Sequence, residues 1–210
     1  MSYPGQLITV EGVDGAGKTT LVASLGEALR ERGLPVKVLR EPGGVQTSEE
    51  IRNLVQDPEL LVGARTEALL YAAARAQLVE EAVRPALEAG QWVLLDRFVD
   101  SSLAYQGVGR GLGIAAIRAL NRFATGDLEP ARTLLLMLPP EQARARTDSR
   151  QEAPDRLERE SDEFFLKIAT AYLELAAAEP ERIRPIDAAS PPADLLSQAL
   201  LALTDLIQHH

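Results

Sequence analysis

The sequence lacks cysteine, long apolar runs and an excess of positive charge, and each shortage excludes a class of protein. With no Cys in 210 residues, disulfide scaffolds and cysteine-ligated metal sites are excluded. No apolar run approaches the roughly 18 to 20 residues that span a bilayer, and the first residues do not resemble a secretory signal. We therefore expect a protein of a reducing, cytoplasmic compartment that does not associate with membranes.

Acidic residues outnumber basic ones by 31 to 22, so the formal net charge is −9. A broadly basic surface is therefore not expected, and a nucleic-acid polymer is not an expected partner. Apolar residues make up 46% and charged residues 25% of the chain, which is typical of a globular protein. The length suits one domain, and we predict a single domain over residues 1–210.

Short apolar segments alternate with longer segments of helical periodicity, a pattern that indicates an α/β fold with a parallel sheet. The predicted strands are 7–10, 35–40, 92–95, 133–138 and 183–186. The predicted helices are 19–32, 48–55 with Ser48 as its cap, 65–89, 114–124, one from 139 that ends near 144, one that ends near 178, and 192–207. Residues 69, 70, 73, 78 and 83 are expected on the buried face of the long helix, and the stretch 100–113, with four glycines, is predicted to be a loop.

Residues 12–19 match the phosphate-loop pattern G-x-x-x-x-G-K-[ST] between a predicted strand and a predicted helix. Glycines let backbone N–H groups curl around an anion, and the helix N-terminus adds partial positive charge. In this pattern Lys18 reaches the β- and γ-phosphates of a nucleoside triphosphate, and Thr19 offers its hydroxyl to Mg²⁺. The predicted ATP-binding residues are Gly12, Val13, Asp14, Gly15, Ala16, Gly17, Lys18, Thr19 and Thr20.

Asp96 and Arg97 follow a predicted strand at the sheet edge where the phosphates should lie. The carboxylate of Asp96 can hold Mg²⁺ or its waters, and the guanidinium of Arg97 can bridge two phosphates. Thr19 and Asp96 are therefore the predicted metal ligands.

Five arginines fall in the polar segment 144–159, which has no apolar face between positions 147 and 155. Such a segment between helices is typical of a mobile lid that closes over a charged substrate. A solvated loop is the alternative interpretation.

Five motifs occur in order along the chain: the phosphate loop with Thr20, Arg40-Glu-Pro-Gly-Gly44, Tyr71-Ala-Ala-Ala-Arg75, Asp96-Arg97 and Ala104-Tyr-Gln-Gly107. On these motifs the chain resembles, over essentially its whole length, the bacterial thymidylate kinases, which use ATP to phosphorylate dTMP to dTDP. The resemblance implies a P-loop kinase fold with a small lid. It also implies a three-layer α/β sandwich whose five-stranded parallel sheet has the order 2-3-1-4-5, and a homodimer.

The resemblance also assigns roles by position. Arg40 matches the arginine that binds the monophosphate, Tyr71 the aromatic that stacks on thymine, and Arg75 the arginine that contacts the base. Tyr105 matches the aromatic beneath the deoxyribose, where it disfavours a 2′-hydroxyl, and Asp14 matches a carboxylate used for the 3′-hydroxyl or for a metal. The predicted substrate-binding residues are Asp14, Arg40, Tyr71, Arg75, Arg97, Ser101, Tyr105 and Gln106.

Position 15 is glycine, whereas some members of this family, the eukaryotic ones among them, carry a catalytic arginine there. We therefore expect the lid to supply that charge, although the sequence does not select one arginine. The predicted catalytic residues are Lys18, Arg97, Arg144, Arg146, Arg150 and Arg156.

Two other functions compete with this prediction. A different small P-loop kinase, of the deoxynucleoside or shikimate type, is opposed by Tyr71, Arg75 and Tyr105 as base and sugar contacts. A nucleotide-binding switch is opposed by the absence of an N-K-x-D guanine motif and by the arginine-rich lid.

Overall fold

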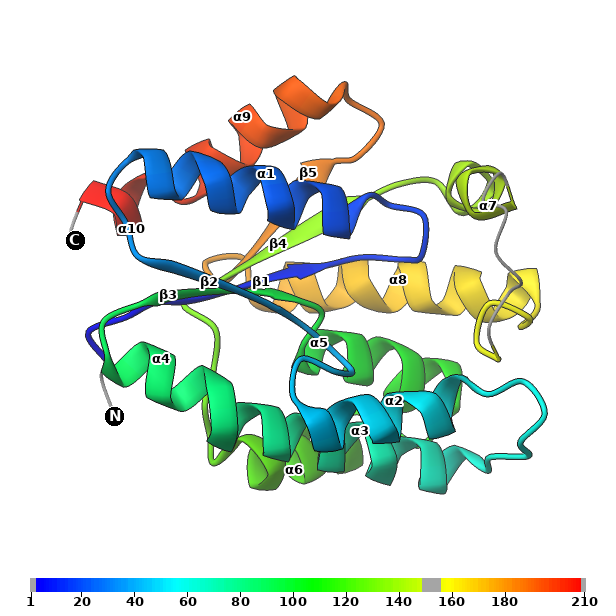
Figure 1. The fold of residues 1–210 in the computed structure, drawn as a ribbon. Helices are drawn as coiled ribbons and strands as arrows, with labels where there is room; N and C mark the ends of the chain where they lie inside the picture. Colours follow the sequence, from blue (N-terminus) through cyan, green and yellow to red (C-terminus); the bar gives the residue numbers. More distant parts are fainter. Residues whose placement is uncertain (1–2, 149–155, 209–210) are drawn as a thin grey trace.

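Five parallel strands form the sheet at the centre of the structure (Figure 1). The structure is a computed structural model that describes residues 3–148 and 156–208. The strands lie in the order β2-β3-β1-β4-β5, which confirms the order implied by the resemblance. Their bounds are β1 Leu7–Glu11, β2 Val36–Arg40, β3 Trp92–Asp96, β4 Arg132–Met137 and β5 Ile183–Asp187.

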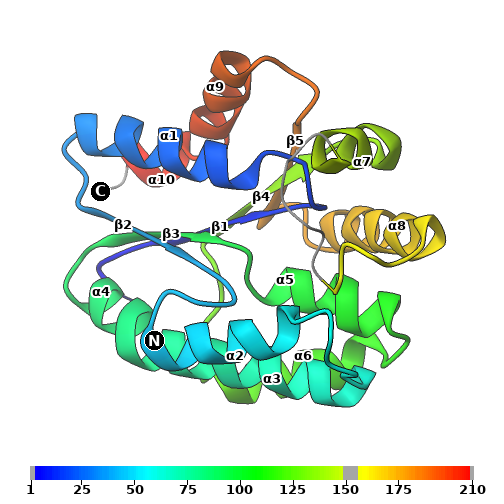
Figure 2. The ribbon, with the colours of Figure 1, turned by 45° about the vertical axis from the view of Figure 1, so that its right-hand side comes forward.

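Helices cover both faces of the sheet and complete the predicted three-layer sandwich (Figures 1 and 2). On one face lie α1, α9 and α10, and on the other lie α3 to α6 and α8, with α2 packed on α3. Central parallel strands are buried on both sides, and β1, β3 and β4 are accordingly mostly apolar. The helix bounds are α1 Lys18–Glu31, α2 Gln46–Gln56, α3 Ala64–Leu78, α4 Arg84–Glu88, α5 Val99–Ser102, α6 Ile114–Thr125, α7 Pro140–Asp148, α8 Asp162–Ala178, α9 Pro192–Ala202 and α10 Thr204–Gln208.

The long helix predicted over 65–89 is confirmed in extent, because α3, a π-helical segment at Val79–Val83 and α4 follow one another directly. Its buried face differs from the prediction. Leu69 and Ala73 are exposed, whereas Glu67 and Arg75 are buried. Apolar periodicity could not find this face because charged side chains form part of it.

The prediction of a loop over 100–113 is confirmed only for 110–113 and is wrong for the rest of that stretch. Residues 99–102 form α5, and a π-helical segment at Leu103–Gly109 continues it. Glycine in a helix costs about 1 kcal/mol, but here tertiary packing outweighs that cost. A Cβ atom at Gly109 would lie 2.7 Å from the ring of Phe164 on α8, so the close approach of α8 needs a glycine at this position.

Three further helix predictions differ from the structure, and one of them, the helix predicted over 192–207, is divided at Leu203 into α9 and α10. Ser48 does not cap α2, which begins at Gln46; its hydroxyl instead donates a hydrogen bond to Ala74 O (2.7 Å) and ties α2 to α3. Helix α7 does not end near 144 but continues to Asp148, and the buried Ala143 packs it against the rest of the molecule. Within residues 3–148 and 156–208, no helix is both long and apolar enough to cross a membrane.

Candidate active site

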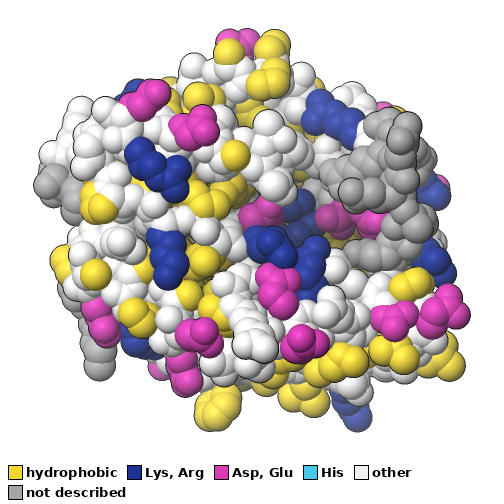
Figure 3. Space-filling view, in the orientation of Figure 1, with side chains coloured by type: hydrophobic (Ala, Val, Ile, Leu, Met, Phe, Trp, Pro, Cys, Tyr) yellow, Lys and Arg dark blue, Asp and Glu magenta, His cyan; other side chains and the backbone are white. Residues whose placement is uncertain are grey.

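A cavity of about 390 Å³ opens at the carboxyl edge of the sheet, beyond the ends of β1, β2 and β3. Ligands of open α/β sheets bind at this edge. Basic and acidic side chains gather around a hollow right of centre in Figure 3. The lining includes Asp14, Gly15, Gly17, Lys18, Thr19, Thr20, Arg40, Tyr71, Arg75, Asp96, Arg97, Ser101, Tyr105 and Gln106. The structure therefore brings together the predicted phosphate loop and all the predicted substrate-binding residues.

The phosphate loop connects β1 to α1 through three glycines with positive φ angles: Gly12 (138°), Gly15 (80°) and Gly17 (95°). Lys18, in the first turn of α1, is buried, and its Nζ donates a hydrogen bond to Val13 O (2.9 Å). Burial and the neighbouring Arg97 guanidinium lower the pKa of Lys18 to about 8. Asp14 Oδ1 lies 3.9 Å from this ammonium group, and an incoming phosphate would add further negative charge beside it.

Helix α7 packs directly on the phosphate loop at Gly15. A Cβ atom at this position would lie 2.3 Å from Ala143 O and 2.9 Å from the hydroxyl of Thr147. Since the contact at Ala143 is with backbone, any side chain at position 15 would require α7 to move. Because position 15 is glycine, the loop carries no arginine there. The same glycine allows α7, which carries Arg144 and Arg146, to pack against the loop.

Thr19 and Asp96 form the pair expected of a metal site. The Thr19 hydroxyl donates a hydrogen bond to Asp96 Oδ2 over 2.7 Å, at the point where α1 begins and β3 ends. In the described part of the chain, no group of three or more His, Cys, Asp or Glu side chains is placed to hold a metal. A hydroxyl and one carboxylate suit Mg²⁺, which commonly keeps several waters and takes phosphate oxygens as further ligands.

Arg97 links the phosphate loop to the opposite wall of the cavity. Its backbone has a φ of 68°, in the left-handed region that is uncommon for residues other than glycine. Its guanidinium donates hydrogen bonds to Gly12 O (3.1 Å) and to Ser101 Oγ (3.0 Å), and pairs closely with Asp14. The ring of Tyr105 lies beneath the guanidinium, 5.2 Å from ring centroid to Cζ.

Asp14 lies between these groups and accepts a hydrogen bond from the Tyr105 hydroxyl (3.0 Å). Burial alone would raise the pKa of Asp14, but Arg97 and Lys18 hold that pKa well below its usual range. The carboxylate is therefore ionised at neutral pH. It offsets part of the positive charge in a cavity that must also accept phosphates.

Glu11, at the end of β1, is a buried residue that the sequence reasoning did not single out. Its carboxylate accepts hydrogen bonds from Phe98 N (2.7 Å), from the Ser101 hydroxyl and from the Tyr172 hydroxyl (3.1 Å). Burial, followed by repulsion from Asp100, raises the pKa of Glu11 to about 7. The only sequence signal was an acidic residue at the end of an otherwise buried apolar strand.

The far end of the cavity is formed by the second and third motifs. Arg75 is only 2% exposed, and its guanidinium pairs with Glu41 and donates hydrogen bonds to Ser102 Oγ (2.9 Å) and Phe98 O (2.9 Å). Arg40 is 54% exposed at the rim, where it pairs with Glu49 (2.8 Å). Arg75 is thus a rigid part of the wall, whereas Arg40 can change partner.

The predicted lid arginines do not line this cavity, as far as the structure describes them. Arg144 pairs with Asp162 beside a second cavity of about 560 Å³ between α7 and α8, and Arg146 donates a hydrogen bond to Ala188 O (3.2 Å). Arg156 pairs with Glu67 on α3 (2.8 Å). Arg150 lies outside the described residues.

Several lining residues were not predicted from the sequence: Glu41, Pro42, Arg52, Gln56, Ser102, Leu157 and Glu158. The spacing of Arg52 and Gln56, one helical turn apart, was the available signal on α2. Residues 157 and 158 fall within the predicted lid segment 144–159, but no local pattern selects these two of its residues as lining the cavity.

The comparisons with known proteins agree with this geometry. The family model described as Thymidylate kinase matches residues 10–199. The chain is 43% identical to the thymidylate kinase of Halorhodospira halophila over 209 residues, covering 99% of this chain and 97% of that protein. It is 45% identical to the thymidylate kinase of Deinococcus radiodurans over 201 residues, covering 96% of this chain and 97% of that protein.

A solved structure gives the same result. The crystal structure of thymidylate kinase from Ehrlichia chaffeensis matches with a TM-score of 0.76 and 27% sequence identity, covering 95% of this chain and 98% of that chain. Sequence and fold therefore agree over nearly the full length, and the chain belongs to the thymidylate kinase family.

Proposed function

We propose that this chain transfers the γ-phosphoryl group of ATP to the phosphate of dTMP in the cavity described above, giving dTDP and ADP for nucleotide biosynthesis. Membership of the thymidylate kinase family supports this reaction. The observation that carries the proposal is that one cavity joins the phosphate loop, through Lys18 and Arg97, to Tyr71 and Tyr105. A phosphoryl donor and a nucleotide acceptor can therefore meet there.

The donor binds at the phosphate-loop end. The backbone N–H groups of the loop and Lys18 hold the β- and γ-phosphates. Thr19 and Asp96 would hold Mg²⁺, which would neutralise charge on the phosphates. The cytoplasm, where ATP and deoxynucleotides are available, is the proposed location.

The acceptor binds at the other end, with its phosphate near Arg97 and Arg40. Tyr71 packs on the base beside Arg75. Tyr105 lies beneath the sugar, with Ser101, Gln106 and Asp14 as polar neighbours. The fixed guanidinium of Arg75, held by Glu41, supports a rigid base pocket, and the exposure of Arg40 supports its exchange of Glu49 for a phosphate.

Little acid–base chemistry is required, because the acceptor oxygen is already anionic. The barrier is the approach of two anions in line, and positive side chains lower it. Lys18 and Arg97 supply part of that charge. Arg144 and Arg146 are the proposed further source among the described residues, since α7 carries both and contacts Gly15. Arg150 remains a prediction.

The test is an ADP-release assay with ATP and a series of acceptors. We expect fast turnover with dTMP, slower turnover with dUMP, and negligible turnover with AMP or shikimate. Turnover of AMP equal to that of dTMP would contradict the acceptor assignment and favour another P-loop kinase activity.

A homodimer is the second part of the proposal. Large apolar side chains are exposed on neighbouring helices α2, α3 and α6 and on the connection after α2: Leu54, Leu61, Leu69 and Phe123. Hydrophobic side chains are also visible along the lower edge of the molecule in Figure 3. Leu69 is 59% and Phe123 89% exposed, and a partner would remove both from water. Light scattering tests this proposal. The wild type should have the mass of a dimer, and Phe123→Glu should shift the protein towards monomer.

A further inference from the structure

A buried carboxylate, Glu67 on α3, lies at the centre of an ionic cluster beside the cavity. Its Oε1 accepts a hydrogen bond from Gln106 Nε2 (2.8 Å), and its Oε2 pairs with Arg110 Nη2 (3.0 Å) and Arg156 Nη1 (2.8 Å). Arg110 also pairs with Glu160 (2.5 Å). Glu67 is fully buried, and we call these five residues the Glu67 cluster.

The cluster contains two arginines and two glutamates, so its formal charges cancel. Removing such charges from water costs about as much free energy as their attraction returns, so buried ion pairs contribute little net stability. The benefit of the arrangement is geometric. Two arginines and an amide have their directions set by one carboxylate.

Of the three side chains that contact Glu67, Gln106 and Arg156 connect it to the cavity. Gln106 is one of its lining residues. Arg156 is followed by Leu157 and Glu158, which also line it. Glu67 thus positions the lining side chain of Gln106, and it also holds Arg156, the residue directly before the lining residues Leu157 and Glu158.

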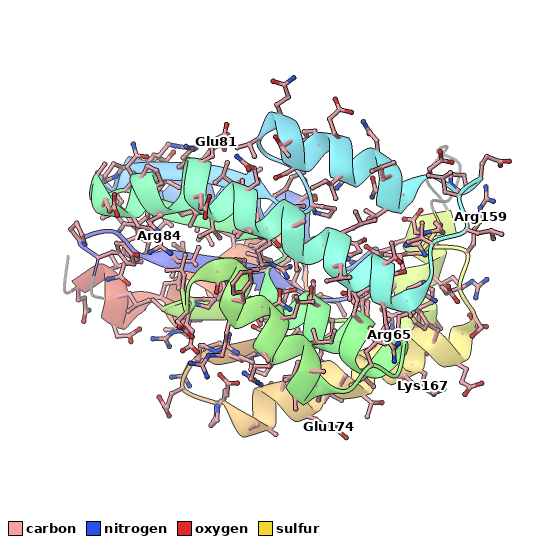
Figure 4. The ribbon with its side chains drawn as sticks, turned by 90° about the horizontal axis from the view of Figure 1, so that it is seen from below. Arg65, Glu81, Arg84, Arg159, Lys167 and Glu174 are labelled. Atoms are coloured by element: carbon pink, nitrogen blue, oxygen red, sulfur yellow. The ribbon has the colours of Figure 1, made fainter. Side chains whose placement is uncertain are left out.

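Arg156 is anchored at both its backbone and its side chain. Its backbone N–H donates a hydrogen bond to Gln56 O (3.3 Å), and its Nε donates one to Val55 O (2.9 Å), both near the end of α2. Figure 4 shows Arg159, in the same turn, at the end of the molecule where α2 leads into α3. Arg156 is therefore held by the end of α2 and by α3, the helix that also brings Tyr71 and Arg75 to the cavity.

We propose that Glu67 is a positioning residue for the acceptor nucleotide, acting through Gln106 and through the Arg156 anchor of the 156–160 turn. The inference rests on the proposed binding of dTMP at this end of the cavity. It gives Arg156 a role in acceptor binding rather than in transition-state charge.

This assignment separates the two substrates. Loss of the anchor should loosen the wall at Gln106, Leu157 and Glu158 and weaken dTMP binding. The donor end depends on the phosphate loop, which has no member in the Glu67 cluster. KM for ATP should therefore stay near its wild-type value, and so should kcat once dTMP is saturating.

The experiment compares Glu67→Gln, Arg156→Gln and the double variant in steady-state kinetics with each substrate varied. Glutamine at 67 keeps an acceptor for Gln106 but removes the charge that pairs with the arginines. We expect each single variant to raise KM for dTMP about tenfold to a hundredfold, the range that corresponds to a lost charged hydrogen bond. KM for ATP should change less than about twofold. The effect of the double variant on KM for dTMP should be smaller than the product of the two single effects, because both single variants remove the same Glu67–Arg156 ion pair.

The control is Arg132→Gln. Arg132 is also a buried arginine in an ion pair, with Asp205 (2.6 Å), but it lies at the start of β4, away from the cavity. It should lower stability without changing KM for dTMP. If Glu67→Gln does not fold, Arg156→Gln carries the test with the same expected separation of the two KM values.

Three results would overturn the inference: an equal rise in both KM values, additive effects in the double variant, or a fall in kcat with KM for dTMP unchanged. The last would give Arg156 a transition-state role. A Gln106→Ala variant separates this inference from the proposed function. If Gln106→Ala leaves KM for dTMP unchanged, the placement of the acceptor is wrong. If it raises that KM and Glu67→Gln does not, only the role of Glu67 is wrong.

Discussion

Replacing Glu11 with glutamine should remove a pH dependence from the stability of the protein. Glu11 is fully buried at the end of β1, and its pKa is raised from 4.5 to about 7, first by burial and then by Asp100. Between these two values the folded protein holds a proton that the unfolded chain has released. The contribution of Glu11 to the free energy of unfolding therefore falls as pH rises through this interval. Above the pKa of the folded state, this contribution no longer changes with pH.

The size of the effect follows from the two pKa values. Each pKa unit corresponds to about 1.4 kcal/mol, and between pH 5 and pH 8 the shift of Glu11 amounts to a loss of about 2 to 3 kcal/mol in the free energy of unfolding. Glutamine has nearly the same shape and does not titrate. Its carbonyl can accept hydrogen bonds from Phe98 N–H and one hydroxyl, while its amide can donate to Ser101 or Tyr172, whose hydroxyl groups can turn.

The assay is urea unfolding of wild type and Glu11→Gln at pH 5 and pH 8, at one protein concentration. The wild type should lose about 2 to 3 kcal/mol more than the variant over this range. Glu174→Gln, an exposed position on α8, serves as the control for a lost carboxylate and should follow the wild type. If Glu11→Gln and wild type lose stability in parallel, the buried carboxyl does not titrate in this range and the reasoning fails.

Four further predictions concern the cavity. Lys18→Ala should stay folded by circular dichroism but lose about a hundredfold or more in kcat, as expected when a preorganised charge is removed. Gly15→Ala should lower the unfolding temperature and raise KM for ATP, because its Cβ would meet the backbone of α7 at a φ of 80°. Tyr105→Ala should reduce the preference in kcat/KM for dTMP over ribothymidine monophosphate, which we expect to be about tenfold to a hundredfold, because an unpaired buried hydroxyl costs 1 to 3 kcal/mol. Arg144→Ala or Arg146→Ala should lower kcat more than it raises KM; near-normal kcat in both would leave α7 with no catalytic arginine.

The sequence alone was sufficient for the parts of the protein that are encoded locally. Apolar runs gave all five strands to within a few residues, because a central parallel strand must be apolar on both faces. The phosphate loop was also readable, since its glycines, Lys18 and Thr19 are consecutive in the chain. The order of the strands came from the resemblance of short motifs, and the structure has that order.

Other features depend on residues that are distant in the chain. Residues 99–109 are helical against their glycine content because α8 packs on them, and Gly109 in particular admits the ring of Phe164. Glu67 and Arg75 occupy the buried face of α3, where apolar periodicity predicts Leu69 instead. A periodicity counts apolar residues and cannot detect a charge that is buried with its partner.

Arg156 shows most clearly which features could not be predicted from the sequence alone. Composition placed it in an arginine-rich lid, and in the sequence it is equivalent to its neighbours Arg150 and Arg159. Its hydrogen bond to Val55 O joins residues 101 positions apart, and its ion pair is with a carboxylate on α3. The sequence determined that a cluster of arginines, interleaved with acidic residues, follows β4. Only the tertiary structure decided where this arginine points, because the direction of a long, flexible side chain is set by the partner that satisfies its charge.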